Sequence, residues 1–112
     1  NMGKVCTVCG KKMLHPAEVR EQMFGIDLGT YLGLRCDSCG ETFLDGEAMD
    51  RVEERAKELG LWGLAVKVKI AKSGNSLVVR IPADLARFLH LRGGEDALVR
   101  PDGRERIVVE LG

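Results

Sequence analysis

Hydrophobic and polar residues alternate most regularly along residues 66–82. Lys67 and Lys69 alternate with three aliphatic residues, and three more aliphatic residues follow at the same spacing after a polar segment at 73–76. A period of two residues predicts strands with one apolar and one polar face, and the polar segment predicts the turn between them. Pro82 ends the pattern where it can open a helix. The alternation therefore predicts a hairpin followed by a helix.

A second hairpin is predicted nearer the start of the chain. Residues 19–24 and 28–34 have the composition of strands. Gly25, Asp27 and Gly29 mark the turn that joins them.

A longer helix is predicted over residues 46–59, because Asp45 can cap its start and Gly60 can end it. Charged residues at i,i+4 spacing predict exposed ion pairs between Glu47 and Arg51 and between Glu53 and Lys57. The helix also carries an apolar stripe that must pack on another surface. This stripe comprises Met49, Val52, Ala56 and Leu59.

The end of the chain predicts a short helix and a last hairpin. The helix follows Pro82, buries Leu85, Phe88 and Leu89, and is closed by Gly93 and Gly94. Strands 97–100 and 104–111 flank Pro101-Asp102-Gly103, in which Asp-Gly is a strong turn signal.

Two knuckles of the pattern CxxCG contain all the cysteines of the chain, which are Cys6, Cys9, Cys36 and Cys39. Two pairs of thiolates suit a tetrahedral zinc ion, and a glycine after each second cysteine lets the backbone turn so that its amides point at sulfur. The sequence therefore predicts one structural Zn²⁺ per chain.

A pair of disulfides is the alternative for these cysteines, which a cytoplasmic location disfavours, although heat-adapted cytosols are an exception. Four sulfurs complete a zinc shell, so His15 is expected to be an exposed loop residue and no coordination position is open for catalysis. No nucleophile with a neighbouring base is evident either, and we expect no enzyme activity.

Charge divides the chain into two halves. Residues 1–60 hold 8 Lys/Arg against 11 Asp/Glu and residues 61–112 hold 9 against 6, although the net charge of the chain is zero. No acidic residue occurs between Leu61 and Ala83. We expect a zinc-ribbon module at 1–60, a linker at 61–65 and a basic module at 66–112. Modules of about 50 residues need a metal or a partner chain to be stable.

The basic module resembles a known family. Lys72-Ser73-Gly74-Asn75-Ser76, followed by Arg80-Ile81-Pro82-Ala83 and a Leu-rich helix, is similar to AbrB/MazE/SpoVT swapped-hairpin DNA-binding domains. The resemblance covers about residues 66–111 and implies that two chains interlace their hairpins into one small β-barrel. It also implies DNA contacts from Lys72, Asn75 and Arg80. Lys67 and Lys69 are further candidates for phosphate contacts, and Asn75 can alternatively be a turn residue at positive φ.

The first module has a looser resemblance. The two knuckles, the ribbon between them and the sequence Gly40-Glu41-Thr42-Phe43 are similar to the zinc-finger module of YgiT/MqsA-type antitoxins. In that family the module binds the cognate toxin, so the resemblance implies a toxin partner without assigning contact residues.

Together these features predict an α+β fold, mainly β, in which a zinc ribbon and a helix precede a homodimeric swapped-hairpin barrel. The expected function is sequence-specific DNA binding by a transcriptional regulator, as the antitoxin of a toxin–antitoxin pair. Two alternatives stay open: a stand-alone regulator with a purely structural zinc module, and an iron electron carrier, because repeated CxxCG also resembles rubredoxin. Since no stretch suits a membrane span or a signal peptide, a cytoplasmic location without membrane contact is expected.

Overall fold

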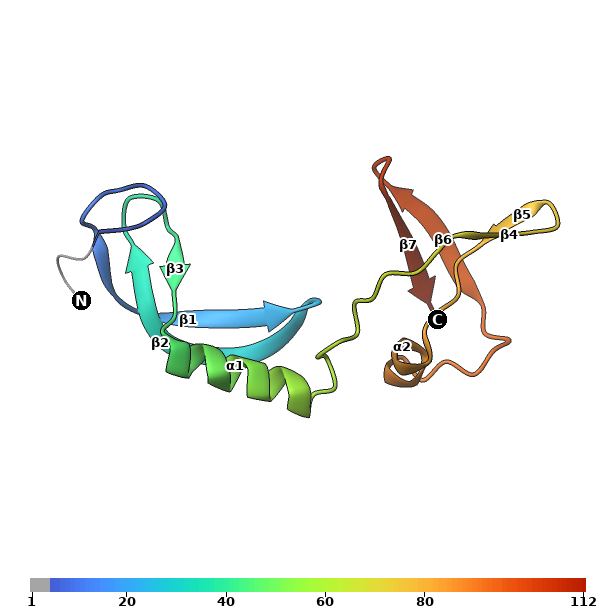
Figure 1. Ribbon diagram of the computed structural model, residues 1–112, viewed down its shortest axis with the longest axis horizontal. Helices are drawn as coiled ribbons and strands as arrows, with labels where there is room; N and C mark the ends of the chain where they lie inside the picture. Colours follow the sequence, from blue (N-terminus) through green and yellow to red (C-terminus); the bar gives the residue numbers. More distant parts are fainter. Residues whose placement is uncertain (1–4) are drawn as a thin grey trace. The chain divides into compact units, whose positions relative to one another are not determined.

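The chain forms two compact units, the first ending at Ala65 and the second comprising Val66–Gly112. The computed structural model describes residues 5–112, and Figure 1 shows the elements of both units. The first unit has one three-stranded sheet and the second has two separate two-stranded sheets. The expected α+β, mainly β class is confirmed. Neither helix within 5–112 is long and apolar enough to cross a membrane.

A long antiparallel hairpin is the scaffold of the first unit. β1 (Leu14–Met23) pairs with β2 (Ile26–Cys36), whose other edge pairs with β3 (Thr42–Phe43). The strands are longer than the predicted 19–24 and 28–34, because the backbone ladder continues through Pro16 and Gly33 to the pair Leu14 and Cys36. The hairpin therefore extends to the second cysteine knuckle.

The turn of this hairpin is tighter than predicted. Met23 pairs with Ile26, so that only Phe24 and Gly25 lie in the turn, and Asp27 and Gly29 belong to β2. The register shifts between Glu21 and Gln22, which leaves Leu28 as an extra residue in β2. This bulge points Leu28 into the core, where the residue is 3% exposed.

Helix α1 (Gly46–Glu58) starts as predicted, with the Ala48 N–H donating to Asp45 Oδ1 at 2.8 Å. Its last turn closes on Leu61, whose N–H donates to the Ala56 carbonyl at 2.9 Å and whose side chain is fully buried. Such a contact beyond the helix end is typical of a Schellman cap.

The side of α1 that packs on β2 agrees with the predicted stripe in part. Of the stripe, Ala56 is buried and Val52 and Leu59 are partly buried, but Met49 is not. The buried residues of α1 are Ala48 and Ala56, whereas Met49 is 53% exposed. Small side chains allow the helix to approach the sheet closely, and the larger Met49 lies to one side. The ion pair of Glu53 with Lys57 is present at 3.0 Å, but Glu47 and Arg51 form none in the described residues.

The second unit contains β4 (Ala71–Ser73), β5 (Ser76–Val78), α2 (Ala83–Phe88), β6 (Ala97–Asp102) and β7 (Arg106–Leu111). β4 pairs with β5 over only three residue pairs, and β6 pairs with β7 over six. The prediction that the first of these hairpins begins at residue 66 is wrong for the single chain, because residues 66–70 have no strand beside them to pair with. Within Val66–Gly112 the two hairpins do not close into a barrel.

Two boundaries in this unit also differ from the prediction. Helix α2 ends at Phe88, and His90, not the later glycines, takes the left-handed conformation that follows it, with φ 57°. A hydrogen bond from the Leu91 N–H to the Ala86 carbonyl at 2.8 Å closes this end. Pro101 and Asp102 lie inside β6, and the turn to β7 starts at Gly103.

Gly33 offers a test of the packing between β2 and β3. A Cβ at this position would overlap the backbone oxygen of Phe43 and would lie 2.7 Å from Leu44 Cδ2. We expect Gly33→Ala to lower the free energy of unfolding of the first unit by about 1–3 kcal/mol. Thermal or denaturant unfolding followed by circular dichroism measures this decrease.

The matched control is Gly46→Ala, because a Cβ at Gly46 meets nothing within 4 Å. This change should leave stability unaltered or raise it, since alanine favours a helix more than glycine does. Equal effects of the two substitutions would contradict the close approach at Gly33.

Candidate metal centre

The structure brings the sulfurs of Cys6, Cys9, Cys36 and Cys39 together, all within 4.8 Å of one another. Cys6 Sγ lies 3.7 Å from Cys39 Sγ, and Cys9 Sγ lies 3.6 Å from Cys36 Sγ. The cluster joins one knuckle that precedes β1 with one that follows β2.

The two knuckles fold in the same way, because both have the sequence pattern CxxCG. The first cysteine of each accepts a hydrogen bond of 2.8 Å at its carbonyl from the N–H of the glycine four residues later, Gly10 or Gly40. The N–H of that cysteine donates at 2.9 Å to the carbonyl five residues later, of Lys11 or Glu41. Gly10 and Gly40 have φ of 78° and 77°, a conformation that residues with a Cβ rarely adopt.

The sulfur spacing fits a tetrahedral metal ion. With a metal–sulfur distance of about 2.3 Å, two ligands of a tetrahedral zinc lie about 3.8 Å apart. Disulfide bonding requires about 2.05 Å between sulfurs, and all four cysteines are free thiols. The cluster can therefore hold a metal ion such as zinc, and such an ion would tie the two ends of the β1–β2 hairpin together.

Burial is unequal within the cluster. Cys6 and Cys36 are fully buried, Cys9 is partly buried and Cys39 is exposed. A backbone hydrogen bond at Glu41 favours the Cys39 thiolate, but desolvation and the neighbouring sulfurs of the other three cysteines raise its pKa to about 12. Without a metal the Cys39 thiol therefore keeps its proton, and a metal must displace that proton, so metal affinity should rise with pH.

His15 is in a different place from the expected exposed loop. It lies in β1 and is partly buried, and its Nε2 is 2.7 Å from Asp37 Oδ1, next to Cys36. Its Nδ1 lies 3.1 Å from the Pro16 carbonyl oxygen. The pair fixes the second knuckle against β1, and sequence analysis missed it because Asp37 and His15 become neighbours only through the register that pairs Leu14 with Cys36.

The candidate DNA-binding residues all lie in the second unit and are exposed. Lys67 and Lys69 precede β4, Lys72 is in β4, Asn75 is in the turn and Arg80 follows β5. Lys72 lies directly opposite Leu77. Residues paired across strands share a face, so the face that was expected to be apolar also carries a lysine.

The turn between β4 and β5 removes one explanation for Asn75. Ser73 pairs with Ser76, and the positive φ of the turn belongs to Gly74, at 60°. Asn75 does not have a positive φ. This sign pattern is that of a type II′ turn, which asks for glycine at the first position and not for asparagine at the second.

Comparisons of the chain with protein-family models, with curated proteins and with solved structures found no match. The two family resemblances therefore rest on the quoted motifs alone.

We expect elemental analysis of freshly purified protein to find about one zinc per chain. Cys36→Ser removes a fully buried ligand, so the variant should lose the metal and the circular dichroism signal of the first unit, because metal binding energy is folding energy in so small a ribbon. Ser38→Ala, an exposed neighbour in the same knuckle, should keep both.

Iron in place of zinc, seen as a red protein, would favour the electron-carrier alternative. A metal content below about half an ion per chain in the parent would contradict the metal centre itself.

Proposed function

We propose that the protein is a homodimeric, DNA-binding transcriptional regulator of the antitoxin type. In this proposal the second unit binds operator DNA, and the first is a module stabilised by one zinc ion. The observation that carries the proposal is a group of unpaired cations on a unit that has almost no core of its own.

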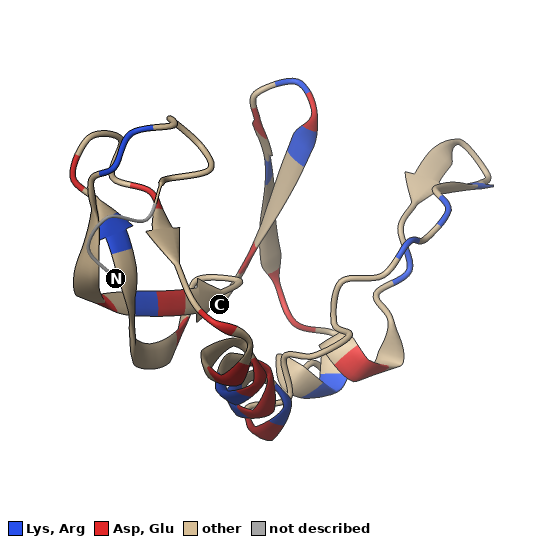
Figure 2. Cartoon of the chain, turned by 60° about the vertical axis from the view of Figure 1, so that its left-hand side comes forward, with Lys and Arg blue, Asp and Glu red and all other residues tan. Residues whose placement is uncertain are grey.

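The cations are Lys67, Lys69, Lys72 and Arg80, and Figure 2 shows that the segment around the β4–β5 hairpin carries no acidic residue. None of the four forms an ion pair with any acidic residue of the described chain. Three other arginines of the unit are paired, namely Arg87 with Asp84, Arg100 with Glu110 and Arg106 with Asp102, whereas Arg92 and Arg104 form no ion pair among the described residues. Unpaired cations on exposed backbone suit the phosphates of DNA.

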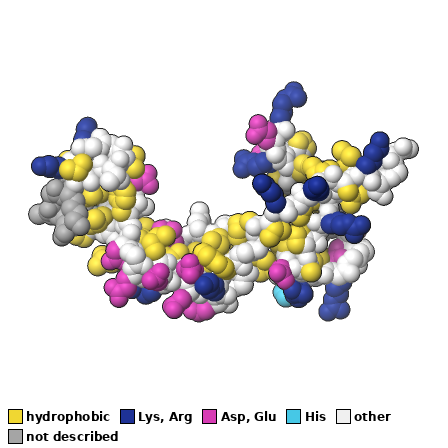
Figure 3. All heavy atoms as spheres, viewed as in Figure 1, with side chains coloured by type: hydrophobic (Ala, Val, Ile, Leu, Met, Phe, Trp, Pro, Cys, Tyr) yellow, Lys and Arg dark blue, Asp and Glu magenta, His cyan; other side chains and the backbone are white. Residues whose placement is uncertain are grey.

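A second chain would supply the core that this unit lacks. All eight buried core residues of the described chain belong to the first unit. Twelve large hydrophobic residues of the second unit are exposed, and Figure 3 shows such side chains at the surface. They are Val66, Val68, Ile70, Leu77, Val79, Ile81, Leu89, Leu98, Val99, Ile107, Val109 and Leu111.

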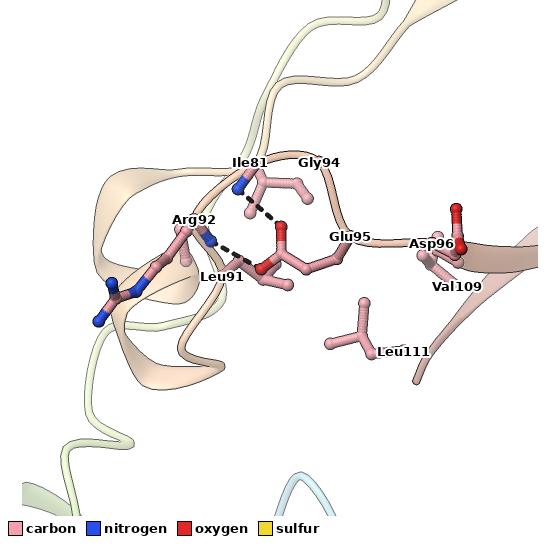
Figure 4. A pocket seen from close by; sticks show the side chains of 11 residues that line it. Ile81, Leu91, Arg92, Gly94, Glu95, Asp96, Val109 and Leu111 are labelled. Atoms are coloured by element: carbon pink, nitrogen blue, oxygen red, sulfur yellow. Dashed lines mark hydrogen bonds between the residues drawn. The ribbon is translucent and has the colours of Figure 1, made fainter.

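An open pocket of about 380 Å³ in the second unit is a place for side chains of the second copy (Figure 4). Its apolar wall includes Ile81, Leu91, Val109 and Leu111. At one side the carboxylate of Glu95 accepts hydrogen bonds from the N–H groups of Arg92, at 2.8 Å, and Gly93, at 2.6 Å. These hydrogen bonds within the loop satisfy the Glu95 carboxylate. The apolar wall of the pocket is therefore available to a hydrophobic segment of the second copy.

Within the DNA-binding proposal the residues have different tasks. Lysines contact phosphates as point charges, whereas arginine and asparagine can bind base edges with two hydrogen bonds. Asn75 and Arg80 are therefore the proposed base readers, and Lys67, Lys69 and Lys72 the phosphate contacts. The acidic balance of residues 1–60, with 8 Lys/Arg against 11 Asp/Glu, favours a protein partner over DNA for the first unit, as an antitoxin requires.

The proposal predicts different effects for two charge removals. Arg80→Ala should weaken binding to a DNA fragment that contains the promoter of the protein's own gene, by about 1–3 kcal/mol per base contact. Its binding to a DNA duplex of random sequence should stay nearly unchanged. Lys72→Ala should weaken both equally and reduce the slope of log affinity against log salt by about 0.9 for each phosphate that is no longer neutralised. Titrations at several salt concentrations measure both effects.

Arg106→Ala is the matched control, because this exposed arginine lies in the same unit but is paired with Asp102 at 3.4 Å. It should bind both duplexes like the parent. If Arg80→Ala also binds the promoter as tightly as the parent, the hairpin is not the surface that reads DNA.

A further inference from the structure

The turn between β1 and β2 holds a bulky residue in a backbone conformation that side chains disfavour. Phe24 and Gly25 form this two-residue turn, with φ of 53° and 77°. Two positive φ values are typical of a type I′ turn, whose first central position favours asparagine, aspartate or glycine. In phenylalanine this conformation brings Cβ too close to the backbone.

Packing of the ring does not offset this strain, because Phe24 is 58% exposed. The other described non-glycine residue with positive φ is His90, whose polar side chain is well solvated where it is. Phe24 is thus the one described residue that combines backbone strain with an exposed aromatic ring. Strain that folding does not explain is a sign of function.

The surroundings of Phe24 suit a protein contact. The flanking pair Met23 and Ile26 is apolar and partly buried, and the turn lies at the end of the hairpin opposite the cysteine knuckles (Figure 1). Glu21 and Asp27 lie on the two strands just behind the turn. Their charge, and the excess of acidic residues in this half of the chain, disfavour nucleic acid and anionic lipid.

We propose that Phe24 anchors the first unit to another protein, one that offers an apolar pocket rimmed by basic side chains. Buried aromatic anchors surrounded by polar contacts dominate the energy of many protein interfaces. This inference rests on the protein partner proposed above for the first unit and names the residue that anchors it, and it does not depend on DNA binding by the second unit.

The first test is stability. Phe24→Asn keeps the turn and removes both the strain and the exposed ring, so the melting temperature of the first unit in the full, metal-loaded chain should rise by several degrees. Met49→Gln replaces a residue that is also exposed, at 53%, without relieving strain, and should leave the melting temperature unchanged. A Phe24→Asn variant no more stable than the parent would show that the ring serves the fold, which would overturn the proposal.

The second test is binding. The protein is expressed in the organism it comes from, with a photo-crosslinking phenylalanine analogue at position 24. After illumination it should be crosslinked to one main protein, which is then identified and purified. That protein should bind the parent chain and the Met49→Gln variant equally, and the Phe24→Asn variant at least about tenfold more weakly. Crosslinks only to lipid, to nucleic acid, to a second copy of this chain or to nothing, or equal affinity for Phe24→Asn, would overturn the proposal.

Discussion

A folded body of about 50 residues has too much surface for its volume to be stabilised by apolar burial alone. This constraint governs both units of the protein. In the first unit the buried apolar residues are few, and two of the three largest fully buried side chains are the cysteines Cys6 and Cys36. These two cysteines form one hydrophobic cluster with Leu14, so a metal bound by the four sulfurs would link the knuckles at a buried position. The β1–β2 hairpin extends from this metal-binding end, and helix α1 packs on β2.

The second unit meets the same constraint with no such cluster. Its hairpins pair locally, but the apolar faces that should cover one another remain at the surface. We propose that a second copy covers them, and the same step would bring two sets of unpaired cations onto one body. Under this proposal dimerisation and DNA binding are linked, because two of the proposed phosphate contacts, Lys67 and Lys69, lie in residues 66–70, which would pair as a strand beside a second copy.

Features that depend on residues close together in the sequence were predicted more accurately than features that depend on distant residues. The knuckles and the Asp45 cap were predicted correctly, since a few neighbouring residues determine them. The pairing of His15 with Asp37 was not, because it depends on the register between distant strands.

Tertiary packing explains the remaining differences. The choice of Ala48 instead of Met49 for the buried side of α1 follows from how closely the helix approaches β2. Strand pairing of residues 66–70 requires a neighbour that the single chain does not provide. The left-handed residues Phe24 and His90 occupy places where the sequence rules expect glycine or asparagine. The hairpin turn and the end of the short helix were therefore predicted at the glycines that follow these residues.

We thus propose that apolar packing within each unit does not stabilise it sufficiently. The first unit also needs a bound metal, and the second needs another copy of the chain. Hydrogen exchange of the full chain, followed by mass spectrometry, tests this claim most directly. We expect a strong chelator to abolish amide protection in residues 5–65 only, and dilution until the protein is monomeric to abolish it in residues 66–112 only. Protection of 66–112 that persists in the monomer, or of 5–65 that persists without metal, would contradict the claim.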